Sequence, residues 1–408
     1  MENIVTSNIT KPTWLQNRCR DFIFKQLAQL LDGELSLVEP DSTKHRFGQR
    51  RTEQCLNAEI RIHDWSCYRD WVINGSIGAA EAYIENKWST SNLTQVIRLF
   101  AKAQKITDKL ESKQSWWSQI SQTLSHWANK NSLAGSKKNI IAHYDLGNEL
   151  YTRFLDKEMM YSSAIYPDPN ATLEQAQLNK LDAICQKLDL KPSDHLLEIG
   201  TGWGGLAVYA ASHFGCKVTT TTISEEQFAY AEQRINELGL QDSITLLKQD
   251  YRTLEGTFDK LVSIEMIEAV GYRYLPEFFK ICNDRLKPNG KMLIQAITIA
   301  DQRFEPYKNS VDFIQKYIFP GGFLPCIAEM TALTQKKTHL VVEGVEDIGL
   351  HYAKTLAHWR ERFLLRWHEI KHHGYDDTFK RLWLYYFGYC EGAFLERSIS
   401  TVQMVLRK

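Results

Sequence analysis

The sequence predicts an α/β fold: a doubly wound, Rossmann-like sheet with a smaller N-terminal accessory domain. The chain has 408 residues, which is too long for one ordinary hydrophobic core, so two domains are expected. From about residue 143 onward, predicted strands alternate with predicted helices, as in a parallel sheet covered on both faces. A glycine-rich loop follows the first of these strands.

The accessory domain is expected over residues 1–105. The segment "FIFKQLAQLL" has the apolar spacing of an amphipathic helix, and "AEIRIHD" alternates like a strand. Two more helices are expected at "AAEAYIENKW" and "NLTQVIRLFAKAQ". None of these segments carries a catalytic motif, so the domain is assigned no chemistry of its own.

Residues 106–142 are expected to connect the two domains. Within them Trp116, Ile120, Leu124 and Trp127 share one helical face, which lysines flank. Such a face could lie on a membrane surface or dock on the protein itself, and both interpretations stay open.

The second domain is expected over residues 143–408. Its strands are "HLLEIG", "KVTTTTIS", "ITLLKQD", "KLVSIE" and "KMLIQAI", with helical segments between them. Doubly wound sheets bind ligands at the carboxyl ends of their strands. Glu265 and Glu268, in "SIEMIEAVG", follow the fourth strand and are expected at that edge.

The composition of the chain is that of an ordinary soluble globular protein with a high content of aromatic residues. Lys plus Arg and Asp plus Glu both number 49, so no nucleic-acid partner is indicated. The 8 cysteines form no CxxC pair, which argues against a metal site or a disulfide framework. No secretory signal or membrane span is apparent, so a cytoplasmic protein is expected. Aromatic residues reach 12%, which suits a large core or a site for cations and apolar ligands.

The glycine loop "LLEIGTGWGG" contains GxGxxG between a strand and a helix. Dinucleotide enzymes normally carry an acidic residue at the end of the second strand, yet "CKVTTTTIS" has none before Glu225. Glu198 lies directly before the glycines, where it would repel a pyrophosphate but attract an ammonium group. S-adenosylmethionine is therefore the expected cofactor.

Several ordered motifs resemble the cyclopropane-fatty-acyl-phospholipid synthase family. They are "HYDLGNELY", "MMYSSAIY", "LEIGTGWGG", "TTISEEQ", "QDYR", "IEMIEAVG" and "KYIFPGGFLP". The resemblance implies a methyltransferase that uses S-adenosylmethionine to methylate cis double bonds of phospholipid acyl chains. It implies cofactor contacts from Tyr161, Ser162, Leu197, Glu198, Gly200, Gly202, Gly204, Gly205, Thr222, Gln227, Tyr251 and Arg252.

The resemblance also implies a base, because ring closure removes a proton from the transferred methyl group. The family is thought to use bicarbonate, held here by Ser163, Glu268, Gln295, Ile297 and Tyr352. Ser163 and Gln295 stand where many members have Cys and His, and neither replacement is a base near neutral pH. With a weaker base the product could be a methyl or methylene branch instead of a ring. Glu265 has no role in this scheme and is interpreted as a helix-start or supporting residue. Cys390 matches a cysteine flagged in the family and is expected to line the pocket.

The expected function is cyclopropane formation on unsaturated phospholipid at the inner face of the membrane. The alternatives are a fatty-acyl C-methyltransferase that makes branched chains, a small-molecule N-methyltransferase, and a membrane-binding module without turnover. A homodimer is left open.

Overall fold

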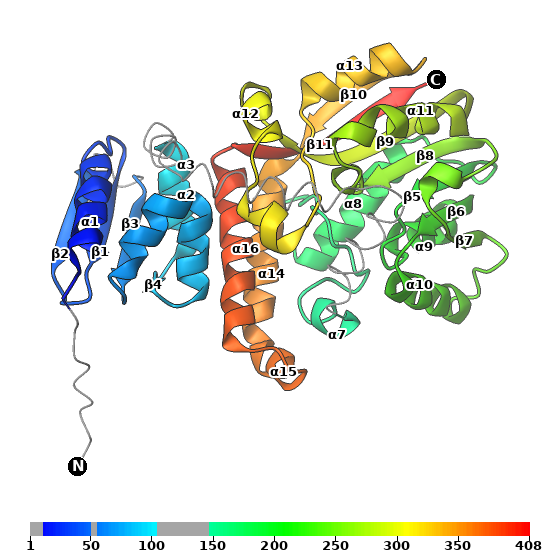
Figure 1. The fold of residues 1–408 in the computed structure, drawn as a ribbon. Helices are drawn as coiled ribbons and strands as arrows, with labels where there is room; N and C mark the ends of the chain where they lie inside the picture. The colour runs from blue at the N-terminus through cyan, green and yellow to red at the C-terminus, as the bar shows by residue number, and fades with distance from the viewer. Residues whose placement is uncertain (1–10, 50–54, 104–146) are drawn as a thin grey trace. The chain divides into compact units, whose positions relative to one another are not determined.

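The computed structural model describes residues 11–49, 55–103 and 147–408 (Figure 1). Of these, residues 11–103 and 376–396 form one compact unit, and residues 147–375 and 397–408 form the other. This division differs from the expected boundary, because α16 (Asp377–Leu395) belongs to the first unit. The expected connector over 106–142, with Trp116, Ile120, Leu124 and Trp127, lies outside the described residues.

The first unit contains a four-stranded sheet of order β2-β1-β3-β4. β1 pairs in parallel with β3 and antiparallel with β2, and β3 pairs antiparallel with β4. The elements are α1 (Trp14–Leu27), β1 (Gly33–Val38), β2 (Lys44–Gln49), β3 (Asn57–Ile62), α2 (Ser66–Ile84), β4 (Trp88–Ser89) and α3 (Leu93–Lys102). The expected helices and the strand at "AEIRIHD" are present, whereas β1 and β2 were not anticipated.

Helix α16 packs closely on α3. A Cβ atom added at Gly392 would lie 2.7 Å from Cγ2 of Ile97, so the two helices approach where glycine leaves room. Thr94 donates a hydrogen bond to the Glu391 carboxylate at 2.8 Å, and both groups are buried. Close packing and a satisfied buried pair explain why α16 belongs with residues distant in sequence.

The second unit contains a seven-stranded sheet of order β10-β11-β9-β8-β5-β6-β7. Strands β5 to β9 run parallel, and β11 is antiparallel to both of its neighbours. The strands are β5 (His195–Ile199), β6 (Lys217–Thr222), β7 (Ile244–Lys248), β8 (Phe258–Ile264), β9 (Leu286–Ile299), β10 (Val341–Asp347) and β11 (Ile399–Arg407). The predicted doubly wound sheet is confirmed; β10 and β11 were not expected.

Helices cover both faces of this sheet (Figure 1). They are α8 (Leu173–Lys187), α9 (Gly205–Phe214), α10 (Glu225–Glu237), α11 (Leu275–Arg285), α13 (Ile327–Lys337) and α14 (Gly349–Leu365). The shorter helices α7 (Asn148–Tyr151), α12 (Phe304–Lys308) and α15 (Trp367–His372) belong to the same unit.

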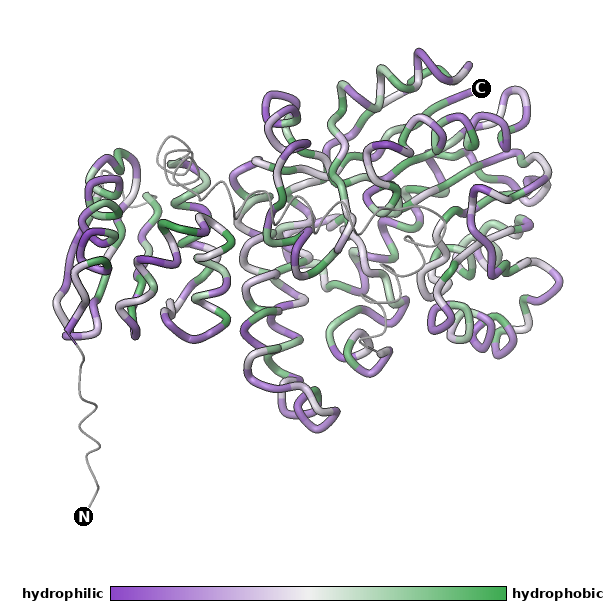
Figure 2. The backbone as a smooth tube through the Cα atoms, in the orientation of Figure 1, coloured by the Kyte–Doolittle hydropathy of each residue, from purple (hydrophilic) through white to green (hydrophobic). Residues whose placement is uncertain are grey.

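Alternation along the strands divides the core into two clusters. Leu196 packs with residues of α8 and α9, whereas Leu197 packs with residues of α11 and α13. Neighbouring strand residues point to opposite faces, so a continuous apolar strand requires helices on both sides. Hydrophobic residues accordingly follow the strands in Figure 2. Within the described ranges, no helix is long and apolar enough to cross a membrane.

The contact between α16 and α3 generates a stability prediction. Alanine favours a helix over glycine by about 1 kcal/mol, yet the new methyl group of Gly392→Ala would collide with Ile97. We expect the collision to prevail and to lower the free energy of unfolding by about 1–3 kcal/mol in urea. Gly344→Ala is the matched control, since its Cβ would meet no atom within 4 Å. A more stable Gly392→Ala protein would show that the helices do not touch there.

Candidate active site

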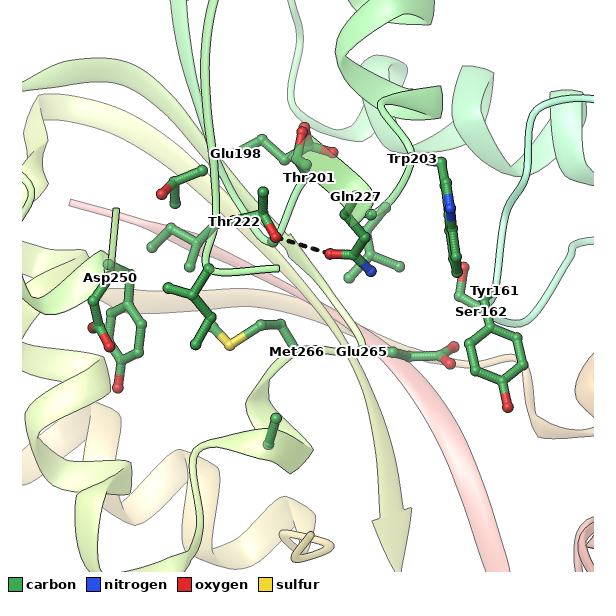
Figure 3. Close-up of a pocket in the computed structure, with 18 of the residues that line it drawn as sticks. Tyr161, Ser162, Glu198, Thr201, Trp203, Thr222, Gln227, Asp250, Glu265 and Met266 are labelled. Carbon is green, nitrogen blue, oxygen red and sulfur yellow. Dashed lines mark hydrogen bonds between the residues drawn. The ribbon is translucent and has the colours of Figure 1, made fainter. Parts of the chain in front are cut away.

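A pocket lies at the carboxyl ends of β5, β6, β7 and β8 in the second unit (Figure 3). Nine of the expected cofactor residues line it: Tyr161, Ser162, Glu198, Gly200, Gly202, Thr222, Gln227, Tyr251 and Arg252. Figure 3 shows Asp250 at one end and Glu265, Ser162 and Tyr161 at the other. The pocket is therefore elongated, with a carboxylate at each end.

The backbone conformation and the close packing of the glycine loop require glycine at several positions. Gly200 has φ +100° and Gly204 has φ +85°, which residues with a side chain rarely adopt. Gly204 precedes α9, and a Cβ at Gly205 would lie 2.6 Å from the Glu158 carbonyl oxygen. These two glycines shape the loop without lining the pocket, and Leu197 is buried in the core. At Gly202 a Cβ would meet no atom within 4 Å, so this position leaves space for a ligand.

Glu198 lies at the floor of the pocket and is 3% exposed. Its carboxylate accepts a hydrogen bond from the Thr220 hydroxyl at 2.5 Å. Burial raises the pKa of Glu198 to about 8. A cationic group beside it would lower that pKa again, so this residue suits a ligand that carries an ammonium group.

The other side of the pocket offers polar partners at the ends of β6 and β7. The Thr222 hydroxyl donates to Oε1 of Gln227 at 2.8 Å, which leaves the Gln227 amide group to face the pocket (Figure 3). Arg252 donates to both oxygens of Asp250, at 2.9 and 2.7 Å, and Tyr251 lies between them in sequence. Sequence reasoning missed Asp250, although its position after a parallel strand was a usable signal.

Glu265 carries the densest set of contacts at the other end of the pocket. Its Oε1 accepts from the Ser163 backbone N–H at 2.9 Å and from Nε2 of Gln295 at 2.8 Å. Its Oε2 accepts from the Tyr352 hydroxyl at 2.8 Å. Ser163, Gln295 and Tyr352 were expected to hold bicarbonate. Here they surround Glu265, to which the resemblance gave no role.

The Gln295 amide is held in one orientation by a chain of buried donors. Gln295 on β9 pairs with Gln403 on β11, and Nε2 of Gln403 donates to Oε1 of Gln295 at 2.8 Å. The Lys187 ammonium group donates to Oε1 of Gln403. Lysine has no acceptor, so it fixes the direction of both amides, and Nε2 of Gln295 must face Glu265.

The segment that carries Ser163 is anchored to α8. The Gln177 amide donates to the Ser162 carbonyl at 3.0 Å, and the fully buried Lys180 donates to the Ser162 hydroxyl at 2.8 Å. The Ser163 hydroxyl turns to the Ala164 carbonyl at 3.0 Å. Ser163 therefore contributes its backbone, not its side chain, to the Glu265 site.

Glu268 occupies a poorer environment. Its Oε1 accepts from the Ile297 backbone N–H, while its buried Oε2 has no hydrogen-bond partner among the residues that the structure describes. Burial, followed by the neighbouring Glu265 charge, raises the pKa of Glu268 to about 8. Burial also raises the pKa of Glu265, but its three donors and Lys180 oppose that shift. Of the two carboxyl groups, Glu265 is better able to hold a negative charge.

Cys390 lies on α16 and so belongs to the first unit, whereas the other predicted site residues belong to the second. Its expected place in the pocket stays a prediction.

The chain resembles known proteins in sequence and in fold. Residues 131–404 match the family model described as mycolic acid cyclopropane synthetase. The chain is 36% identical over 362 residues to a cyclopropane-fatty-acyl-phospholipid synthase of Escherichia coli, which covers 86% of this chain and 88% of that protein. It is also 36% identical over 340 residues to a tuberculostearic acid methyltransferase of Mycobacterium tuberculosis, which covers 82% and 79%.

A solved mycolic acid cyclopropane synthase, complexed with SAH and CTAB, is 27% identical to this chain. It superposes with a TM-score of 0.62 and covers 67% of this chain and 98% of that one. Fold, pocket and relatives together define an S-adenosylmethionine-dependent methyltransferase. The chain belongs to the mycolic acid cyclopropane synthetase family.

The glycine loop generates a prediction about cofactor binding. Gly205→Ala would push the start of α9 away from the Glu158 carbonyl and so distort the loop. We expect S-adenosylmethionine affinity to fall at least tenfold, or about 1.4 kcal/mol, in calorimetry. Gly344→Ala should bind like the wild type, because its added methyl group meets nothing. Equal affinity in all three proteins would contradict the close contact.

Glu268 generates a prediction about pH. The folded protein keeps the Glu268 proton up to about pH 8, whereas the unfolded chain loses it near pH 4.5, the ordinary pKa of a glutamate. The folded state then binds more protons in this window, so Glu268 costs stability progressively as pH rises through it. We expect Glu268→Gln to gain stability over the wild type by about 4 kcal/mol more at pH 8.5 than at pH 5. Thermal unfolding at both values measures this, and a constant difference would refute it.

Proposed function

We propose that the protein transfers a methyl(ene) group from S-adenosylmethionine to cis double bonds of phospholipid acyl chains and forms cyclopropane rings. When bound, S-adenosylmethionine supplies an electrophilic methyl group. An isolated alkene is a weak nucleophile, and its methylation leaves positive charge on carbon. A protein that performs this reaction has to exclude water, stabilise the charge and remove a proton.

The observation that carries the proposal is an aromatic cluster around Tyr161, at the Glu265 end of the pocket. The Tyr161 ring centroid lies 5.2 Å from Tyr151 and 5.2 Å from Trp359. Phe154 lies 6.3 Å from Tyr161, and Tyr352 lies 5.9 Å from Trp359. Aromatic faces stabilise a cation without reacting with it, and their bulk keeps water away.

A second candidate is a fatty-acyl C-methyltransferase that makes a methyl or methylene branch. The specific observation in its favour is the equal identity, 36%, to the cyclopropane synthase and to the tuberculostearic acid methyltransferase. Both candidates share the first bond-forming step and differ in which proton or hydride moves next.

The substrate class implies where the protein acts. Phospholipid acyl chains lie within a bilayer, so we place the protein at the inner face of the membrane as a peripheral protein. The aromatic face at residues 116–127 is the candidate contact from the sequence.

Lipid analysis tests the proposal. We expect phospholipids from bacteria that express the protein to gain one CH₂ per cis double bond by mass spectrometry, with upfield ring protons in NMR. Cells with an empty vector supply the control. Vinylidene or methyl signals in place of ring protons would favour the branched product. Unaltered lipids, despite S-adenosylmethionine turnover on an amine, would overturn the proposal.

A further inference from the structure

The donors assigned to bicarbonate by family resemblance already have an acceptor in this protein. Ser163, Gln295 and Tyr352 all donate to Glu265, through the backbone N–H, the amide and the hydroxyl. The Ile297 N–H donates to Glu268. A carboxylate and a bicarbonate ion present the same planar pair of oxygens, so they compete for one set of donors.

A bicarbonate ion does not fit beside Glu265 either. It would meet the charge of Glu265, which repels an anion, and the carboxyl group of Glu268 offers it at most one proton. The buried Lys180 already donates to the Ser162 hydroxyl. Within the described part of the chain, the donors that the resemblance assigns to bicarbonate are therefore already used by the protein's own carboxyl groups.

The backbone of Glu265 is itself unusual. It has φ +48°, a left-handed conformation that is uncommon for a residue with a side chain. Its N–H continues the β8–β9 ladder by donating to the Gln295 carbonyl at 2.8 Å. Such strain persists where the surrounding structure enforces it, and it is concentrated at functional sites. In this protein the strained backbone of Glu265 carries a side chain that reaches Ser163, Gln295 and Tyr352.

We infer that the Glu265 carboxylate is the protein's own base and replaces bicarbonate, so that turnover needs no external anion. The substrate in this inference comes from the proposed function. The competition between Glu265 and bicarbonate for the same donors does not depend on that function. Glu265 lines the pocket, so it is placed to touch the reacting atoms. Gln295, Gln403 and Tyr352 are positioning residues that act through it.

Glu265 alone can accept and release the one proton that ring closure removes. After methyl transfer, the electron pair of one C–H bond of the new methyl group forms the last C–C bond of the ring. The proton of that bond goes to Glu265, which becomes a neutral acid. Glu265 then releases the proton to water when the product leaves. No oxidant, metal or added anion is required.

Three proteins test the inference: wild type, Glu265→Gly and Glu265→Gln. Glycine accepts φ +48° without strain and vacates the three donors, whereas glutamine fills the space without a basic oxygen. Bicarbonate itself is the probe, in calorimetry and in turnover on vesicles of unsaturated phospholipid in CO₂-free buffer. We expect both variants to lose about 100-fold or more in turnover.

The inference predicts that bicarbonate changes wild-type turnover less than twofold and shows no binding. In Glu265→Gly, bicarbonate should bind and restore turnover at least tenfold, while Glu265→Gln should gain nothing. Matching circular dichroism spectra of all three proteins would exclude a folding defect. Bicarbonate binding to the wild type, or wild-type turnover that depends on it, would overturn the inference and leave the proposed function standing. Absence of any lipid product from the wild type would instead overturn the proposed function, and bicarbonate calorimetry would still decide the inference.

Discussion

The site depends on one constraint: a carboxylate withdrawn from water must find donors within the protein. Glu265 finds three of them, on the segment before α8, on β9 and on α14. Each donor is positioned in turn, as Gln295 is by Gln403 on β11. A single charge thus ties together elements that are far apart in sequence, and the pocket inherits its geometry from that network.

The two neighbouring carboxyl groups divide their roles by environment. Within the described ranges Glu265 has three donors, whereas Glu268 has one donor and a buried oxygen without a partner. Two buried carboxyl groups close together favour sharing one proton, and the group with more hydrogen-bond donors keeps the charge. Burial likewise raises the pKa of Glu198, and a cation bound beside it would lower that pKa again.

Sequence patterns predicted the parallel strands and the glycine loop because both depend on local periodicity and on backbone conformation. They also located nine of the residues that line the pocket. They did not predict the role of Glu265, since its partners Ser163, Gln295 and Tyr352 lie 102, 30 and 87 positions away. The grouping of α16 with the first unit escaped prediction for a similar reason: it rests on contacts such as Thr94 with Glu391, 297 positions apart.

The most direct test is a crystal structure of the protein with S-adenosylhomocysteine, grown and soaked in bicarbonate. We expect continuous side-chain density from Glu265 to the Ser163 N–H, Gln295 and Tyr352, with no separate anion among them. A distinct planar density on those three donors, with the Glu265 side chain turned away, would contradict the account.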